Sequence, residues 1–118
     1  MKFIDTHTHL FAKEFDNDIN DVVENAISNG IEKMLLPNID SSTTKAMINL
    51  CKQYPNNCHP MIGLHPCSVK KENIKEEIKK ILDELKKNSF VAIGEIGIDL
   101  YWDKTTLDVQ KEAFETQI

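Results

Sequence analysis

The residues best suited to chemistry stand near the amino terminus, in segment 5–10 with the sequence DTHTHL. If this segment ends a strand, His7 and His9 are two residues apart and project from the same side of the sheet. Two such imidazoles can chelate one divalent cation, whereas a position that needs only packing would carry Val or Ile. Asp5 lies on the same side, where it can orient an imidazole. The alternative is an exposed strand tip that happens to carry two histidines, and the pattern alone does not identify a reaction.

Two later segments add further polar candidates, GLHP at 63–66 and GEIGID at 94–99. Glu95 interrupts an apolar run and is flanked by glycines, which allow other groups to approach the backbone closely. Because a buried carboxylate is costly unless it is paired or bound to a metal, we predict that Glu95 is a ligand, the alternative being a structural carboxylate whose partners satisfy it. His65 and Asp99 are open to a second interpretation, since a histidine before proline can cap a turn and an aspartate can begin one.

The spacing of apolar residues predicts the elements that must position these side chains. Short apolar runs, expected as strands, span residues 3–7, 31–36, 61–64 and 90–96. A helix should follow each, because apolar residues then recur every three or four positions. The expected apolar faces are Ile19, Val22, Val23, Ala26 and Ile27; Met47, Leu50, Cys51 and Tyr54; Ile74, Ile78, Ile81, Leu82 and Leu85; and Ala113 with Phe114. Expected boundary residues are Gly30 after the first helix, Ser41 or Ser42 and Ser68 before the next two, and Thr105 or Thr106 before the last.

Four strand–helix units with short connections indicate an α/β protein with a parallel sheet covered by helices. A doubly wound sandwich and a barrel both satisfy this pattern. In either fold, functional residues gather at the carboxyl ends of the strands, which is where the candidate side chains stand.

Composition excludes several functional classes. The chain has 118 residues and a net charge of −5, so no overall basic field attracts nucleic acid. All 14 basic residues are lysines, which removes the usual bidentate arginine clamp for phosphate.

The apolar runs are too short to cross a membrane, and a strand is expected at the position where a secretory signal would begin. Cys51, Cys58 and Cys67 are an odd number, which favours a reducing cytoplasm over a disulfide scaffold. His65 with Cys67 lacks a second pair for a zinc finger.

Together, DTHTHL, GLHP and GEIGID, in this order and spacing, resemble the TatD family of metal-dependent deoxyribonucleases. Gln110, Ala113 and Phe114 are similar to the helix that follows in that family. The resemblance covers all 118 residues and implies a TIM-type (β/α)8 barrel of the amidohydrolase-like superfamily, with four consecutive βα units here as its N-terminal half.

The resemblance also implies an activity, the hydrolysis of DNA phosphodiester bonds with two divalent cations, which can be Mg, Mn or Zn. It makes His7, His9 and Glu95 metal ligands, with Glu95 at both metals, and places His65 and Asp99 at the substrate. Related amidohydrolases carry a carbamylated lysine on the fourth strand, where this chain has Glu95, which argues against dihydroorotase-like chemistry.

A complete barrel of this type needs roughly 250 residues, and the family's other ligands, two histidines and a catalytic aspartate, belong to the second half. We therefore expect residues 1–118 to form one incomplete domain that is weakly active or inactive alone. Its first and fourth strands would have unpaired edges that favour self-association or pairing with the missing half. The alternatives are another metal-dependent phosphoesterase or lactonase on the same barrel, which would cleave small esters and ignore DNA, and a non-catalytic half-barrel that only self-associates.

Overall fold

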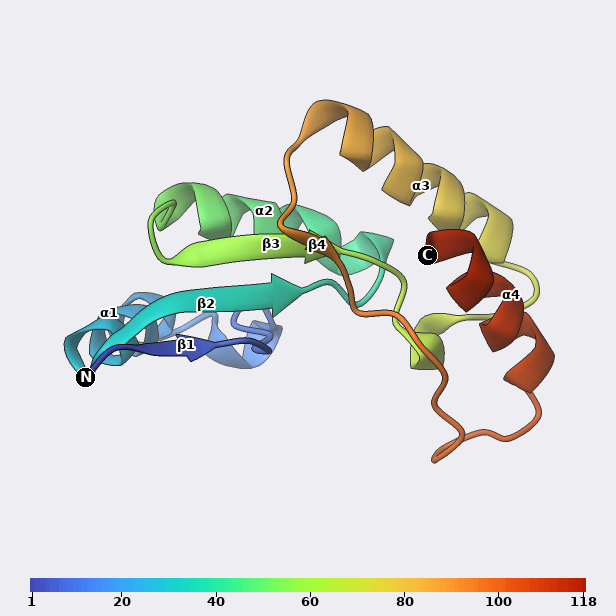
Figure 1. The fold of residues 1–118 in the computed structure, drawn as a ribbon, viewed down its shortest axis with the longest axis horizontal. Helices are drawn as coiled ribbons and strands as arrows, with labels where there is room; N and C mark the ends of the chain where they lie inside the picture. Colours follow the sequence, from blue (N-terminus) through green and yellow to red (C-terminus); the bar gives the residue numbers. More distant parts are fainter.

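The four strands pair in chain order and all run parallel (Figure 1), in a computed structural model that describes residues 1–118. Their bounds are β1 Phe3–Asp5, β2 Ile31–Pro37, β3 Cys58–Ile62 and β4 Ala92–Ile93. Each strand is hydrogen-bonded to the one before it in sequence, so β1 and β4 form the two edges. The predicted parallel sheet of consecutive strands is confirmed.

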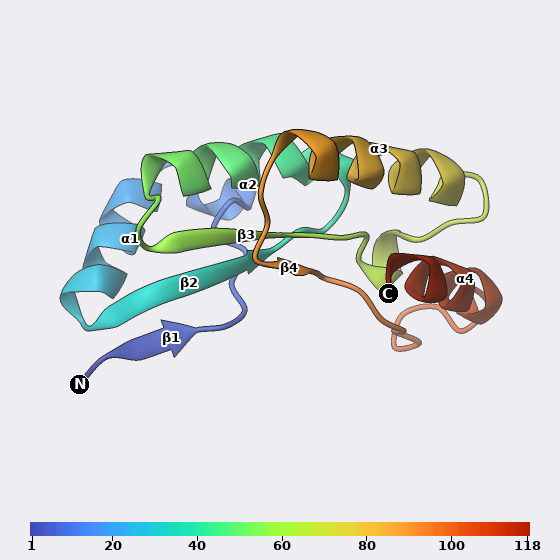
Figure 2. The ribbon, with the colours of Figure 1, turned by 45° about the horizontal axis from the view of Figure 1, so that its top comes forward.

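Three of the four α-helices cover one face of this sheet. The α-helices are α1 Ile19–Ser28, α2 Ser41–Gln53, α3 Ile74–Lys87 and α4 Leu107–Gln117, and short 3-10 helices are η1 Lys13–Phe15 and η2 Pro66–Ser68. Figure 2 shows α1, α2 and α3 on the same side of the strands, whereas α4 lies beyond their carboxyl ends. A doubly wound sandwich covers both faces of its sheet, while a barrel wall carries helices on the outer face only. The chain is therefore half of a TIM-type barrel.

The core lies between the sheet and these helices. Met34 and Leu36 on β2 are fully buried, and the intervening Leu35 points away and is partly exposed. From the helical side, Val23 and Met47 are equally buried. Burial of such a side chain is worth about 1.5–3 kcal/mol, so this layer fixes the orientation of the strands whose ends carry the candidate residues.

Three strand boundaries differ from the prediction. β1 ends at Asp5 instead of His7, because the Asp5 carboxylate turns the chain by accepting the backbone N–H of His7 at 3.1 Å. β3 begins at Cys58 and ends at Ile62, shifted from the predicted 61–64. β4 is much shorter than the predicted 90–96, since the chain leaves the sheet ladder after residue 93.

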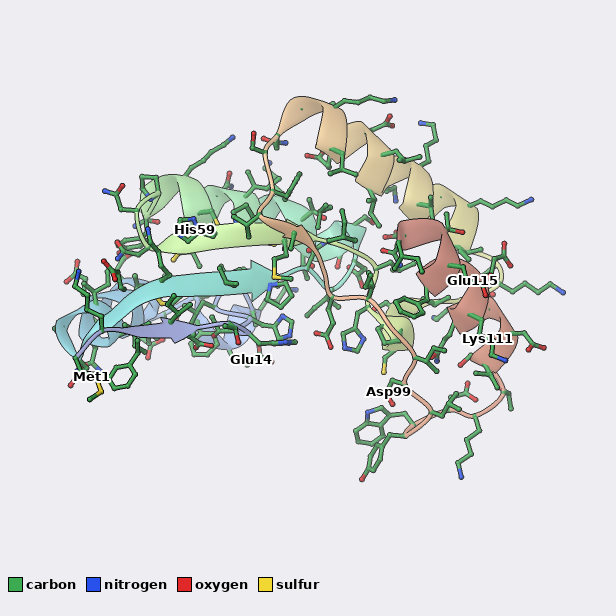
Figure 3. The ribbon with its side chains drawn as sticks, in the orientation of Figure 1. Met1, Glu14, His59, Asp99, Lys111 and Glu115 are labelled. Carbon is green, nitrogen blue, oxygen red and sulfur yellow. The ribbon has the colours of Figure 1, made fainter.

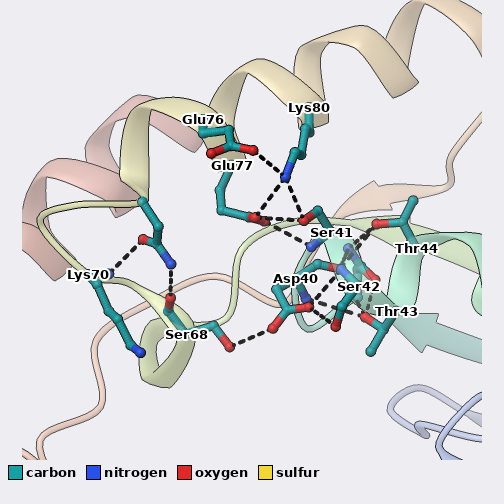
Figure 4. Close-up of polar contacts among 12 residues, drawn as sticks. Asp40, Ser41, Ser42, Thr43, Thr44, Ser68, Lys70, Glu76, Glu77 and Lys80 are labelled. Carbon is teal, nitrogen blue, oxygen red and sulfur yellow. Dashed lines mark hydrogen bonds and ion pairs between the residues drawn. The ribbon is translucent and has the colours of Figure 1, made fainter.

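The beginning of α2 is capped by Asp40, and not by Ser41 or Ser42 as predicted. Its Oδ1 accepts the backbone N–H of Ser42 at 2.9 Å (Figure 4). The same end is tied to α3, where Glu77 accepts the Ser41 N–H at 2.8 Å and the Ser41 hydroxyl at 2.6 Å. A helix N-terminus has free N–H groups and a positive dipole end, so a carboxylate there is well placed.

Two further helix predictions need correction. Leu82 and Leu85 were expected in the core, but their exposed fractions are 53% and 40%, because only one side of α3 faces α2 and α4. Ser68 ends η2, and α3 begins only at Ile74. The other boundaries are confirmed: Gly30 follows α1 with φ +93°, a conformation that favours glycine, and α4 begins directly after Thr106.

Candidate metal centre

His7, His9 and Glu95 meet at the carboxyl end of the sheet, although β1 and β4 stand at its opposite edges. One ligand atom from each residue lies within 4.8 Å of the other two. Glu95 Oε2 is 3.0 Å from His7 Nε2 and 3.4 Å from His9 Nε2, and the two Nε2 atoms are 3.2 Å apart. Two imidazole nitrogens and a carboxylate that point at one another form a donor set that suits a divalent cation such as zinc or manganese.

His9 is held in the tautomer that a metal ligand requires. Its Nδ1 lies 3.0 Å from the carbonyl oxygen of Pro37, which can only accept, so Nδ1 carries the proton. The lone pair of the neutral ring is therefore on Nε2, which faces His7 and Glu95. A histidine that donates its other N–H to a backbone carbonyl has the usual arrangement of a metal ligand.

Glu95 provides the test of whether these residues fit a cation. Its Oε2 is buried and receives no hydrogen bond, because the nearby imidazole nitrogens lack hydrogen-bonding geometry toward it. An unpaired buried carboxylate oxygen is costly, and a cation among the three donors would remove that cost. The backbone N–H of Glu95 donates to the Asn38 carbonyl at 3.0 Å, which fixes where the side chain begins. The three residues fit the group that the sequence predicts.

His65 lies beside this cluster with the opposite tautomer. Its Nδ1 accepts the backbone N–H of Cys67 at 3.0 Å, so the neutral ring carries its proton on Nε2. That Nε2 is 3.3 Å from Glu95 Oε1, whereas His7 and His9 are close to Oε2 of the same carboxylate. The sequence left open whether His65 caps a turn or serves the site; it caps η2 and also faces the site.

Asp99 stands at the outer rim of the same end. Its Oδ1 accepts the Tyr101 N–H at 2.8 Å, as in a turn, and its Oδ2 lies 3.3 Å from the thiol of Cys67. The Tyr101 N–H, then the Cys67 thiol, lower the pKa of the Asp99 carboxyl below its usual value. Burial and the same carboxylate raise the pKa of the Cys67 thiol, so this cysteine is a neutral donor. Asp99 is thus both a turn residue and a member of the polar rim.

Three amide side chains, of Asn38, Gln110 and Gln117, hold these segments in place, a role that the sequence did not reveal for any of them. The Asn38 amide donates to the Thr44 hydroxyl at 2.9 Å, its Oδ1 accepts from Thr43 at 2.9 Å, and the residue is 1% exposed. It therefore fixes the backbone that receives Glu95. The signal for it was weak, because a single Asn after a strand also suits an ordinary loop.

The other two amides lie on α4 and bind the loops that carry His65 and Asp99. Gln110 accepts the Asp99 N–H at 2.8 Å and donates to the Asp99 carbonyl at 2.8 Å. Gln117 accepts the Leu64 N–H at 2.7 Å, directly before His65. Both stand seven residues apart on the face that carries buried Ala113. Polar residues on an apolar helix face were the available signal.

Other predicted residues lie outside the cluster. Asp5 hydrogen-bonds the backbone of His7, and no hydrogen bond joins its carboxylate to an imidazole. His59 lies on β3, far from Asp99 (Figure 3). Cys51, Cys58 and Cys67 are all free thiols. No helix of the structure combines the length and the hydropathy needed to span a membrane.

Comparison with known proteins places this geometry in context. Residues 4–118 match the family described as TatD related DNase. The uncharacterized metal-dependent hydrolase YabD of Bacillus subtilis is 36% identical over 114 residues, which cover 97% of this chain and 44% of YabD. The 3'-5' ssDNA/RNA exonuclease TatD of Edwardsiella piscicida is 26% identical, with 98% of this chain and 44% of that protein covered.

A solved structure shows the same backbone arrangement. The crystal structure of YjjV, a TatD homologue from Escherichia coli K12, superposes with a TM-score of 0.80 at 27% identity. The alignment covers 98% of this chain and 44% of YjjV. The chain thus spans about half the length of the relatives that it matches.

Proposed function

This chain belongs to the TatD family of metal-dependent hydrolases, and from that premise we propose that its site serves the hydrolysis of DNA phosphodiester bonds. The observation that carries the proposal is the convergence of His7, His9 and Glu95 beside His65. The nuclease assignment is supported by relatives that are named for it, including one named for single-stranded DNA and RNA. Residues 1–118 form one domain in this proposal, and the activity is proposed for the complete barrel.

We assign His7, His9 and Glu95 as ligands of a divalent cation, which can be Mg, Mn or Zn. Bound there, it would supply Lewis-acid chemistry that lowers the pKa of water and withdraws charge from a phosphoryl oxygen. Glu95 presents Oε2 to His7 and His9 and Oε1 to His65, so each of its oxygens would be able to hold a cation. We propose that the complete enzyme binds two cations at this site.

His65 and Asp99 act on the substrate in this proposal. The Nε2–H of His65 points into the site, and in the absence of arginine it is a donor suited to a phosphate oxygen. Asp99 is held ionised at the rim by the Tyr101 N–H, where a carboxylate can accept a hydrogen bond from a sugar or a base. Gln110 and Gln117 are positioning residues for these two side chains.

Calorimetric titration of the chain with Mn²⁺ and Zn²⁺ tests the ligand assignment without any substrate. We expect His9→Ala and Glu95→Gln to weaken binding at least tenfold, whereas His59→Gln is the matched control because His59 lies away from the site. Binding by Glu95→Gln as tight as that of the unaltered chain would refute the assignment.

A second experiment tests the reaction. Single-stranded DNA is incubated with the chain and Mn²⁺, alongside bis(p-nitrophenyl) phosphate and p-nitrophenyl acetate. EDTA-sensitive cleavage of DNA that is lost in His9→Ala would support a nuclease. Cleavage of the small esters alone would favour the phosphoesterase or lactonase alternative. Because the activity is proposed for the complete barrel, metal binding without any hydrolysis would show only that residues 1–118 are non-catalytic by themselves.

The proposal includes a cytoplasmic location, supported by the three free thiols, which a reducing compartment maintains.

A further inference from the structure

Two adjacent aromatic side chains are presented to solvent at the rim of the candidate site. Tyr101 and Trp102 follow Asp99 in the β4–α4 connection, and each is 80% exposed. Their rings pack edge to face with centroids 4.7 Å apart. Large aromatic side chains are usually buried in a core, so the solvent exposure of two adjacent ones is typical of a binding surface.

The pair stands on a backbone that is already fixed. The Tyr101 N–H is bonded to the Asp99 carboxylate, and Asp99 is held on both its N–H and its carbonyl by Gln110. Beyond the pair, Asp103 accepts the backbone N–H of Thr105 at 2.8 Å. Both ends of the aromatic segment are therefore tied, and little conformational entropy would be lost when a ligand packs on it.

The position of the pair connects it to the proposed chemistry. Trp102 lines a small cavity of about 100 Å³ together with Asp99, Cys67 and Lys70. Cys67 is bonded through its N–H to His65, which in turn faces Glu95. A group lying against Trp102 is thus separated from the metal ligands by only a short chain of contacting residues.

The charges around the pair select the kind of group that fits. Asp99 and Asp103 both line the cavity, and their carboxylates would repel a phosphate, although Lys70 offers one positive charge. A flat, uncharged group avoids that repulsion and gains contact with an aromatic face. Nucleobases have these properties, and stacking of bases on exposed aromatics is the usual way to hold single-stranded nucleic acid.

We propose that Tyr101 and Trp102 form a stacking platform for an unpaired nucleobase of the nucleic-acid strand whose phosphodiester lies at His7, His9 and Glu95. This inference rests on the proposed function, since it takes the substrate to be a nucleic acid. It assigns the pair to binding and specificity for single strands, because a base within a duplex cannot leave its partner to stack here without cost.

The sequence supplies its own probe, because Trp102 is the only tryptophan of the chain. Its fluorescence is followed while the chain is titrated with (dT)8 or with an abasic octamer of the same length. EDTA is present, so neither metal binding nor cleavage takes part. We expect (dT)8 to quench the emission and to bind roughly tenfold or more tightly than the abasic strand, since each stacked base contributes appreciably to affinity.

Variants are then compared by the anisotropy of a labelled (dT)8. Trp102→Ala should weaken binding roughly tenfold and Trp102→Phe much less, whereas Phe3→Leu, which alters an exposed aromatic at the other end of β1, should have no effect. Trp102 is exposed, so circular dichroism should show all variants folded. Equal affinity for the two octamers, absence of binding, or an unaffected Trp102→Ala variant would each overturn the proposal. The proposed function is tested separately, by the metal titration without nucleic acid and by the cleavage assay, and neither readout depends on Trp102.

Discussion

The carbonyl oxygen of Asn38 accepts the backbone N–H of Glu95 at 3.0 Å, so the end of β2 determines where a residue that follows β4 stands. Asn38 also donates its own backbone N–H to Met61 and to Gly94, at 3.1 and 3.0 Å. One residue therefore connects the ends of β2, β3 and β4. The candidate metal centre depends on this buried junction as much as on its three ligands.

Asn38→Ala tests that dependence. It leaves the Asn38 backbone bonds in place but removes the side-chain bonds to Thr43 and Thr44, and buried partners are left unsatisfied. We expect a loss of about 1–3 kcal/mol in the free energy of unfolding and weaker Mn²⁺ binding, by urea denaturation and calorimetry. Asn49→Ala, at an exposed position of α2, is the control and should change stability by less than about 0.5 kcal/mol. Equal effects of the two substitutions would contradict this role.

The two glutamines of α4 hold different backbone amides, so their roles can be tested separately. Gln110→Leu should raise the hydrogen-exchange rate of the Asp99 amide, and Gln117→Leu that of the Leu64 amide, because each loses its acceptor. NMR-detected exchange reads both amides in both variants, so each serves as the control for the other. If either substitution accelerates both amides equally, the effect is global destabilisation and not the loss of a local bond.

His9 and His65 should differ in tautomer in the metal-free chain above pH 8. We expect the proton of His9 on Nδ1, bonded to Pro37, and that of His65 on Nε2, because its Nδ1 accepts from Cys67. Long-range ¹H–¹⁵N correlation spectra distinguish the two forms. The same tautomer in both rings would show that one of these hydrogen bonds is wrongly assigned.

Stability should decline in mildly alkaline solution. Burial raises the pKa of Cys51 to about 12 and that of Cys58 to about 11, from an ordinary value of 9.0. The unfolded thiols ionise near pH 9. Above that pH the folded state therefore holds more protons than the unfolded state, and the free energy of unfolding falls as pH rises. Urea denaturation at pH 8, 9 and 10 measures how steeply this free energy depends on pH. A Cys51→Ala/Cys58→Ala variant should show a shallower slope, and an unchanged slope would count against this origin.

The exposed edges of the sheet are expected to promote self-association. Phe3 and Ile4 on β1 are 51% and 60% exposed, and Ile93 on β4 is 36% exposed. Unpaired strands with apolar side chains pair readily with another chain. Sedimentation velocity should show concentration-dependent oligomers that diminish in Ile4→Lys, whereas Lys111→Glu on α4 should leave them unchanged. Monomers at all concentrations would disprove this expectation.

Much of the architecture could be predicted because it depends on local patterns. Apolar runs and helical stripes define four strand–helix units. His7 and His9 do lie together as expected, although β1 ends at Asp5 and their rings meet in the segment that follows the strand. Glu95 was predictable because a carboxylate inside an apolar run needs a partner. Leu82 and Leu85 were misplaced because a stripe of apolar residues can be wider than the surface that buries it.

The remaining features depend on partners that are distant in sequence. β4 is short because Glu95 bonds to Asn38 instead of continuing the ladder, and no local pattern reveals that exchange. The roles of Gln110 and Gln117 could not be assigned for the same reason. An amide side chain accepts and donates equally well, so its sequence position says little about which backbone it holds.

The bond between Gln117 and Leu64 also bears on the order in which the chain acquires its structure. Each strand pairs with the one made just before it, so the sheet can grow from the amino end as synthesis proceeds. The backbone N–H of Leu64, directly before His65, cannot form its hydrogen bond until Gln117 has been synthesised, 53 positions later. The imidazole pair after β1 can thus be in place early, while the segment that presents His65 gains its Gln117 contact only when α4 docks.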